Sequence, residues 1–299
     1  MTAKLVFQYV VFPGLLFIAI VGMLMSWLER KISARIQWRK GPPWYQSFAD
    51  LIKLMGKEVL VPAEANLFTF YFAPLLAFFS VALAGAVVMV SGLYKVGFVG
   101  DLIVVAYLLI MPSLALVLGG SASGNPVSAV GASREMNLAF SYELPFVLAI
   151  MVPIIKSGGA IKLTELGQVN SMVYASGIIA FVVMVVTLHA KLGFPPFDIA
   201  EAETELMGGV ILEYSGILLG LFKLAKQMLL LVGPAFIVQI LWGGLNSWWA
   251  ILKIGLVFLL LVLIKNTNAR LRIDQALKFF WYIIGPLAAL SVILALSGW

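Results

Sequence analysis

The sequence has no cysteine and a single histidine, His189, and only 11% of its 299 residues are charged. Without cysteine the chain cannot form a disulfide, a thiolate zinc site or the usual cysteine-ligated iron–sulfur cluster. One histidine in a long apolar chain is more often a hydrogen-bonded structural group than a proton carrier. We therefore expect no metal site and no redox centre in this chain, so any redox chemistry has to lie in partner proteins.

Polar segments long enough for a soluble domain are also missing. Hydrophobic residues make up 62% of the chain, which is more apolar surface than a soluble domain can bury. Eight apolar runs have about the length that a bilayer requires: 5–28, 67–93, 101–120, 136–156, 171–190, 208–232, 247–265 and 278–297. The sequence predicts an all-α membrane protein of about eight transmembrane helices, forming one domain over 1–299. The apolar region continues to Leu241 past Pro234, which leaves room for a ninth, short segment.

The distribution of Lys and Arg predicts the orientation. Loops 29–66, 121–135, 191–207 and 265–277, with Lys278 just beyond the last of them, carry thirteen of the twenty basic residues, whereas the opposite side carries four. Basic residues gather on the cytoplasmic side of membrane proteins. We therefore expect these loops in the cytoplasm, both termini outside, and the cell membrane as the location. The net charge of +6 is largely this signal, and no soluble basic face suggests nucleic-acid binding.

The first cytoplasmic loop holds eleven charged residues and a Gly41-Pro42-Pro43 break. After the break, Phe48, Leu51, Ile52 and Met55 repeat at helical spacing, which predicts a short amphipathic helix. Such a helix can anchor at lipid headgroups or form a platform for a soluble partner, and the number of charges favours the platform. The residues expected to dock a redox module are Arg30, Arg35, Arg39, Asp50 and Lys53, with Arg134 and Glu135 from the next cytoplasmic loop.

Loop 121–135 leads into a span that contains a carboxylate. Its Gly, Ser and Pro predict irregular structure up to about Gly131, with Ser133 as a helix cap. Glu143 then falls about two turns into the fourth apolar run and is followed by Pro145, which loosens the local backbone hydrogen bonds. A carboxylate there is either a proton-exchanging group or a structural residue hydrogen-bonded to a neighbouring helix.

Segment 189–214, HAKLGFPPFDIAEAETELMGGVILEY, places acids between two apolar runs. If 198–213 is one helix, four acids share a sector of about 120° on its surface: Asp198, Glu201, Glu205 and Glu213. This would be a carboxylate stripe leading into the membrane, and the alternative is a solvated acidic loop. Lys226 either joins the relay or snorkels to the interface. The residues expected to relay protons or charge are Glu143, Asp198, Glu201, Glu203, Glu205, Glu213 and Lys223.

Three blocks of this sequence resemble one family. They are Glu29-Arg30-Lys31 with Ala34-Arg35-Ile36-Gln37, Gly41-Pro42 and Ala49-Asp50; Ser133-Arg134-Glu135 with Ser141 to Pro145; and Pro196-Phe197-Asp198 with Glu201 to Glu205 and Glu213 to Gly216. Their order and the eight spans resemble the quinone-site membrane subunit of respiratory complex I, the NuoH or NADH dehydrogenase subunit 1 type. The resemblance implies a subunit between a redox module and an ion-pumping arm, with acids that begin a charge relay.

Two departures point to a subtype. Quinone-reducing members carry Glu and Arg shortly before Pro-Phe-Asp, where this chain has Lys191 and Phe194, and the first loop is shorter here. The resemblance is therefore nearer to membrane-bound [NiFe]-hydrogenases and ferredoxin-dependent sulfane sulfur reductases of archaea. It implies partners with iron–sulfur clusters, with or without a nickel–iron centre, a hydrogenase-large-subunit-like protein and antiporter-like membrane subunits. A quinone-reducing subunit, a stand-alone transporter and an inert anchor remain the alternatives.

Overall fold

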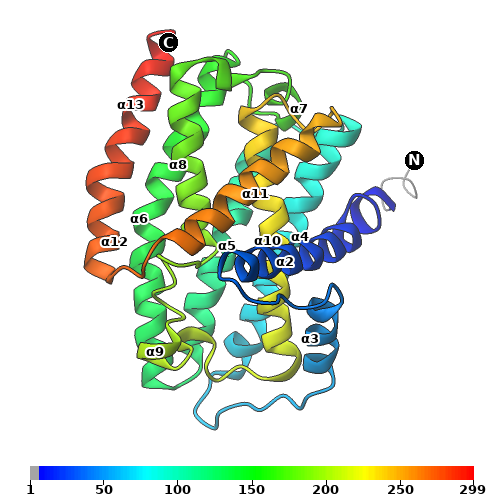
Figure 1. The fold of residues 1–299 in the computed structure, drawn as a ribbon, viewed down its shortest axis with the longest axis vertical. Helices are drawn as coiled ribbons and strands as arrows, with labels where there is room; N and C mark the ends of the chain where they lie inside the picture. The colour runs from blue at the N-terminus through cyan, green and yellow to red at the C-terminus, as the bar shows by residue number, and fades with distance from the viewer. Residues whose placement is uncertain (1–6) are drawn as a thin grey trace.

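The computed structural model describes residues 7–299 as a bundle of long helices (Figure 1). Within these residues seven helices are long and apolar enough to cross a membrane, and an eighth apolar helix, α8 (Ala175–Lys191), is shorter. The seven are Phe7–Ile36, which includes α2 (Leu15–Ile36); α4 (Leu67–Tyr94); α5 (Asp101–Ala122); α6 (Pro126–Lys156); α10 (Gly216–Leu241); α11 (Trp249–Thr267); and Ile273–Leu296. The last combines α12 (Ile273–Phe279), the π-helical turn η3 (Phe280–Ile284) and α13 (Gly285–Leu296). The predicted all-α membrane fold is confirmed.

Helix α10 forms the centre of the bundle. It contacts α2, α4, α8 and α11, and every residue from Met228 to Leu241 is buried. A helix that is apolar on all sides is stable only when other helices surround it. The peripheral helices instead leave large apolar side chains exposed, such as Ile293 and Leu296 of α13, as expected of a surface that faces lipid.

Helix α2 crosses the front of α10 obliquely, below α11 in the view of Figure 1. The crossing is close because Gly22 of α2 has no side chain. A Cβ atom there would lie 2.8 Å from the carbonyl oxygen of Gln227 and from the Cα atom of Met228. Small residues let membrane helices approach to backbone contact in this way.

The first loop contains the short helix α3 (Gln46–Met55) at the predicted place. Phe48 and Leu51 pack against the core, whereas Ile52 and Met55 are 68% and 59% exposed. The helix packs on α10, where Leu51 and Leu54 lie beside Gly220. Its position at a membrane surface stays a prediction.

Helix α6 begins ten residues before the predicted start of the fourth apolar run. The expectation of irregular structure to Gly131 with Ser133 as the cap was wrong. Asn125 is the N-cap, and its side-chain oxygen accepts a hydrogen bond of 2.8 Å from the backbone N–H of Val127. Pro126 follows at the first helical position, where its missing N–H costs nothing. Asn-Pro was therefore the start signal.

The sixth span also differs from its prediction, since it covers Gly216–Leu241 and not 208–232. Pro234 lies inside this helix without ending it, and among the described residues no separate ninth segment follows. A proline in a buried membrane helix is tolerated because packing against neighbouring helices holds the chain in place.

Candidate functional site

Residues 192–215 connect α8 to α10, and we call them the acidic segment. They are irregular apart from α9 (Glu203–Leu206) and a 3-10 turn, η2 (Gly209–Ile211). Met207, Gly208 and Gly209 all have positive φ angles, of 53°, 102° and 52°. A Cβ atom at Gly209 would collide with the carbonyl oxygen of Ala200, so only glycine fits there. This reversal ends any helix, and the expected continuous helix over 198–213 was wrong.

The acids of this segment consequently do not form one stripe. Asp198 pairs with Arg270 at 2.5 Å, Glu201 with Lys226 at 2.7 Å and Glu205 with Arg134 at 2.8 Å. These cations come from the α11–α12 loop, from α10 and from α6. Each carboxylate is thus held by a different element of the fold, and Asp198 is buried while Glu205 lies at the surface.

The last two acids predicted in this region have different outcomes. Glu213 accepts a hydrogen bond of 2.5 Å from the side-chain amide of Asn125, the cap of α6. It lies between η2 and α10, not inside a span. The side chain of Glu203 falls outside what the structure describes.

Glu143 lies in the middle of α6 and forms an ion pair with Lys191, the last residue of α8. The Lys191 side chain is 1% exposed, and its ammonium group lies 4.3 Å from the centre of the Phe146 ring. Aromatic faces stabilise a desolvated cation in this position. The second oxygen of Glu143, Oε2, is buried and has no hydrogen-bond partner in the described part of the chain. One acceptor therefore remains available beside the lysine.

A cavity of about 320 Å³, which we call the inner cavity, lies beside this pair. Its wall includes most of the ionisable groups of the region: Glu135, Lys191, Asp198, Glu201, Lys223 and Lys226. Glu135, predicted to dock a partner, is 7% exposed and faces this space, so it lies at the inner cavity and not on an exposed docking surface. It precedes Glu143 by two turns of α6, roughly 12 Å along the helix.

A second cavity of about 480 Å³, the outer cavity, lies between α2, α3 and α10. Lys223 and Lys226 line both cavities, so the two spaces adjoin at these lysines. Lys226 is bonded to Glu201, and it also donates to the carbonyl oxygen of Gly193 at 3.4 Å. A charged lysine pair thus separates the cavities.

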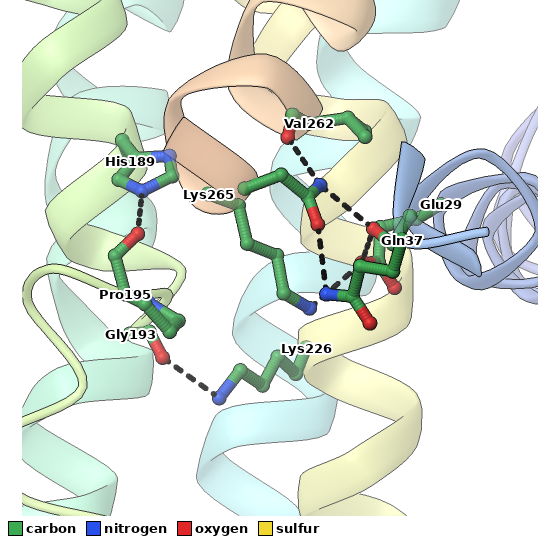
Figure 2. A network of polar contacts seen from close by, with 10 residues as sticks. Glu29, Gln37, His189, Gly193, Pro195, Lys226, Val262 and Lys265 are labelled. Atoms are coloured by element: carbon green, nitrogen blue, oxygen red, sulfur yellow. Dashed lines mark hydrogen bonds and ion pairs between the residues drawn. The ribbon is translucent and has the colours of Figure 1, made fainter. Parts of the chain in front are cut away.

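A lysine from α11 binds one of the acids of the outer cavity. Lys265 pairs with Glu29 of α2 at 2.7 Å, and Figure 2 shows it directed between α2 and the acidic segment near Lys226. The ammonium groups of Lys265 and Lys226 lie 4.3 Å and 5.7 Å from the centre of the Phe194 ring. Phe194 therefore brings two cations together where the quinone-reducing pattern has arginine.

His189 belongs to the same view but faces a backbone group. Its Nε2 atom shares a hydrogen bond of 2.7 Å with the carbonyl oxygen of Pro195 (Figure 2), and its ring packs edge-on against Phe194 and Phe197. The interaction fixes the turn after α8. This geometry fits the structural interpretation of the lone histidine.

The expected docking residues divide into two groups. Arg30 pairs with Asp50 at 3.0 Å and ties α2 to α3, while Arg35, Arg39 and Lys53 are exposed. Burial alone would raise the pKa of Asp50, but hydrogen bonds from Arg30 and Gln46 hold that pKa below its ordinary value. The carboxylate is thus ionised and fixes the α2–α3 contact. Among the side chains that the structure describes, no three acidic or histidine groups come close enough to hold a metal ion.

Comparison with known proteins identifies the family. Residues 9–296 match the family model described as NADH dehydrogenase. The chain belongs to the NADH dehydrogenase family. Two relatives in this family are the H subunits of the NADH-quinone oxidoreductases of Dehalococcoides mccartyi (strain CBDB1) and Thermomicrobium roseum. The first is 33% identical, with 93% of this chain and 82% of the relative aligned, and the second is 32% identical, with 90% and 88% aligned.

A solved structure extends the family comparison to the fold. The chain is similar to one in the structure of the membrane-bound sulfane sulfur reductase, an archaeal respiratory membrane complex. The TM-score is 0.87 at 26% identity, and 98% of this chain and 99% of the other are covered. The predicted family, and its likeness to the sulfane sulfur reductase branch, are confirmed.

Sequence reasoning missed the cations of this site. Lys191, Lys265 and Arg270 were read as orientation signals or as a departure from the family pattern, yet each pairs with an acid. The missing signal was charge balance, because a carboxylate in an apolar setting needs a nearby cation. Asn125 was missed for another reason: its partner Glu213 lies 88 residues away.

Proposed function

We propose that this protein is the membrane-anchor and coupling subunit of an ion-translocating, complex I-like oxidoreductase. The observation that carries the proposal is the pair of adjoining cavities, which place ionisable groups in series from the α2–α3 surface to Lys191, the ion-pair partner of Glu143 in α6. Lys226 and Lys223 occupy the junction of the two spaces. Ionisable groups inside a membrane domain usually mark a path for protons or ions.

The relay works by exchange of ion-pair partners. Protonation of Glu201 would release Lys226, and protonation of Glu143 would release Lys191, because a neutral carboxylic acid no longer holds a cation. Lys191 lines the inner cavity together with Glu135, which offers the released cation another acid. The acidic segment is the element with two arrangements that such coupling requires. Its glycine reversal and separate ion pairs allow it to rearrange without disturbing the spans.

The redox module docks on the cytoplasmic side of this chain. Arg35 and Arg39 present exposed cations at the end of α2. The Lys and Arg distribution favours the cytoplasm for this end and the outside for both termini. The chain has no cysteine, so iron–sulfur clusters belong to the partners. The likeness to the sulfane sulfur reductase chain supports a respiratory membrane complex of that kind. In this proposal the complex is a ferredoxin-linked reductase or hydrogenase with antiporter-like membrane subunits.

A quinone-reducing complex is the second candidate function. The aligned relatives are named as subunits of NADH-quinone oxidoreductases, which favours it, and the outer cavity is large enough for an aromatic headgroup. Against it stands Phe194 between two lysines in that cavity. A quinone analogue added to the purified complex separates the two candidates. Inhibition of electron transfer by the analogue supports quinone reduction. An unchanged rate of electron transfer at saturating analogue supports the ferredoxin-linked reaction.

The coupling proposal is tested in the assembled complex in proteoliposomes. Glu201→Gln removes one titratable group that lines the inner cavity and keeps an oxygen that can accept from Lys226. We expect electron transfer to continue and ion uptake to fall by at least about tenfold. The expectation is conservative, because loss of a positioned proton-transfer group usually slows a reaction by more than this. The matched control is Glu165→Gln, which changes an exposed acid paired only with Lys162. If Glu201→Gln assembles and pumps ions normally, the relay assignment is wrong.

A further inference from the structure

The outer cavity carries an excess of positive charge. Five basic and two acidic side chains line it: Arg30, Lys53, Lys57, Lys223 and Lys226 against Glu29 and Asp50. Both acids are already engaged, because Asp50 is held by Arg30 and Glu29 by Lys265. Asp50 also attracts Lys223 from a longer distance, but the cavity has more cations than these two carboxylates can neutralise.

Three of these cations lack a counter-charge at ion-pair distance. Lys226 pairs with Glu201 outside the cavity, whereas Lys53, Lys57 and Lys223 form no ion pair in the part of the chain that the structure describes. All three are exposed to this space or to the solvent around it. Gathered amines repel each other and lower the cost of bringing in an anion, most of all where the surroundings are poorly hydrated.

The same cavity has an apolar wall. Leu51 and Leu54 of α3 and Leu224 and Leu230 of α10 line it together with the lysines. A small inorganic anion has no use for such a wall, whereas an anion that carries a hydrocarbon chain can bury the chain against it.

We propose that the outer cavity binds the phosphate headgroup of an anionic membrane phospholipid. Lys53, Lys57 and Lys223 contact the phosphate, and the first part of one acyl chain lies against the leucines of α3 and α10. Basic pockets between membrane helices on the cytoplasmic side suit this class of ligand. The bound lipid seals the space between α2 and α3 and supplies the missing negative charge beside Lys53, Lys57 and Lys223.

The test uses the complex in nanodiscs of phosphatidylcholine with added phosphatidylglycerol, with retained lipid measured by mass spectrometry after delipidation. Wild type should retain phosphatidylglycerol in preference to phosphatidylcholine. Each lysine near an anionic headgroup contributes about fivefold in affinity. Lys53→Gln, Lys57→Gln and Lys223→Gln combined should therefore lower retention by about a hundredfold. Lys40→Gln, Lys95→Gln and Lys278→Gln combined, which change exposed lysines elsewhere by the same net charge, should not.

Single variants keep the test decisive if the triple variant fails to assemble. Lys223→Gln should lower phosphatidylglycerol retention about fivefold, and Lys223→Arg should restore it. Equal retention of the two lipids by wild type, or unchanged retention in Lys223→Gln, would overturn the proposal. Displacement of the lipid by inorganic phosphate at equal affinity would overturn it in favour of a phosphate site without a lipid role. Lipid bound to the isolated chain but absent from the complex would overturn it in favour of an acidic partner segment in the cavity.

Discussion

Lys191 and Glu143 form an ion pair between α8 and α6 in which the lysine side chain is almost completely buried. Removing one partner of a buried pair leaves an uncompensated charge and costs about 3–5 kcal/mol. We therefore expect Glu143→Gln and Lys191→Met each to lower the thermal unfolding temperature of the detergent-solubilised protein. The double variant Glu143→Gln/Lys191→Met should be more stable than either single variant.

The surface pair Lys162–Glu165 is the control for this cycle. Its side chains are 37% and 51% exposed, so Lys162→Met and Glu165→Gln should change stability by less than about 1 kcal/mol and should add independently. If the double variant Glu143→Gln/Lys191→Met is no more stable than either single variant, the buried-pair interpretation is contradicted.

The crossing of α2 over α10 gives a second prediction. Gly22→Ala places a methyl group against backbone atoms of Gln227 and Met228, which cannot move aside easily. Overpacking of this kind costs about 1–3 kcal/mol. Gly255→Ala in α11 has open space around the added carbon and should instead stabilise its helix by up to about 1 kcal/mol. Thermal unfolding of the two variants should therefore shift in opposite directions, and a shared direction would refute the close-contact argument.

Asn125 is expected to act in two ways, as the cap of α6 and as the donor to Glu213. Asn125→Asp keeps a capping oxygen but places a negative charge against the carboxylate. Asn125→Ala loses both interactions and should cost about 1 kcal/mol for the cap alone. We expect Asn125→Asp to lower the thermal unfolding temperature, and we expect the added change Glu213→Gln to restore it. Rescue of Asn125→Ala to the same extent would show that the Asn125–Glu213 contact is unimportant.

The contact between Arg30 and Asp50 predicts a pH dependence of α3. Because the folded-state pKa of Asp50 is lowered, the pair stabilises α3 at neutral pH and loses its contribution as the pH falls through that pKa. Arg30→Gln should move the loss to higher pH, with an effect of at most about 1 kcal/mol because both side chains are substantially exposed. The chain has no cysteine, so a spin label at Ile52→Cys can report the mobility of α3 during the titration. Identical titrations of both proteins would contradict this role.

Hydropathy predicted the spans because each of the seven described long helices contains an apolar stretch long enough to cross a membrane, even where its ends are charged. It failed at helix ends, where the start of α6 depends on the single cap Asn125 and the start of α10 on the glycine reversal at 207–209. The carboxylates of the site could be predicted from the sequence because acidic residues are rare within and beside long apolar runs. Their cations were not assigned, since Lys191 pairs across 48 residues and Lys265 across 236. Local spacing carries no information about such distant pairs.

The three ion pairs of the acidic segment also bear on how this protein can change over time. Asp198, Glu201 and Glu205 each form an ion pair with a cation from a different part of the chain. Replacing one acid removes the negative charge that its cation faces, so a lineage that loses the acid is expected to change that cation soon afterwards. Among related sequences we therefore expect covariation within each pair of positions, independently of the other pairs: 198 with 270, 201 with 226, and 205 with 134.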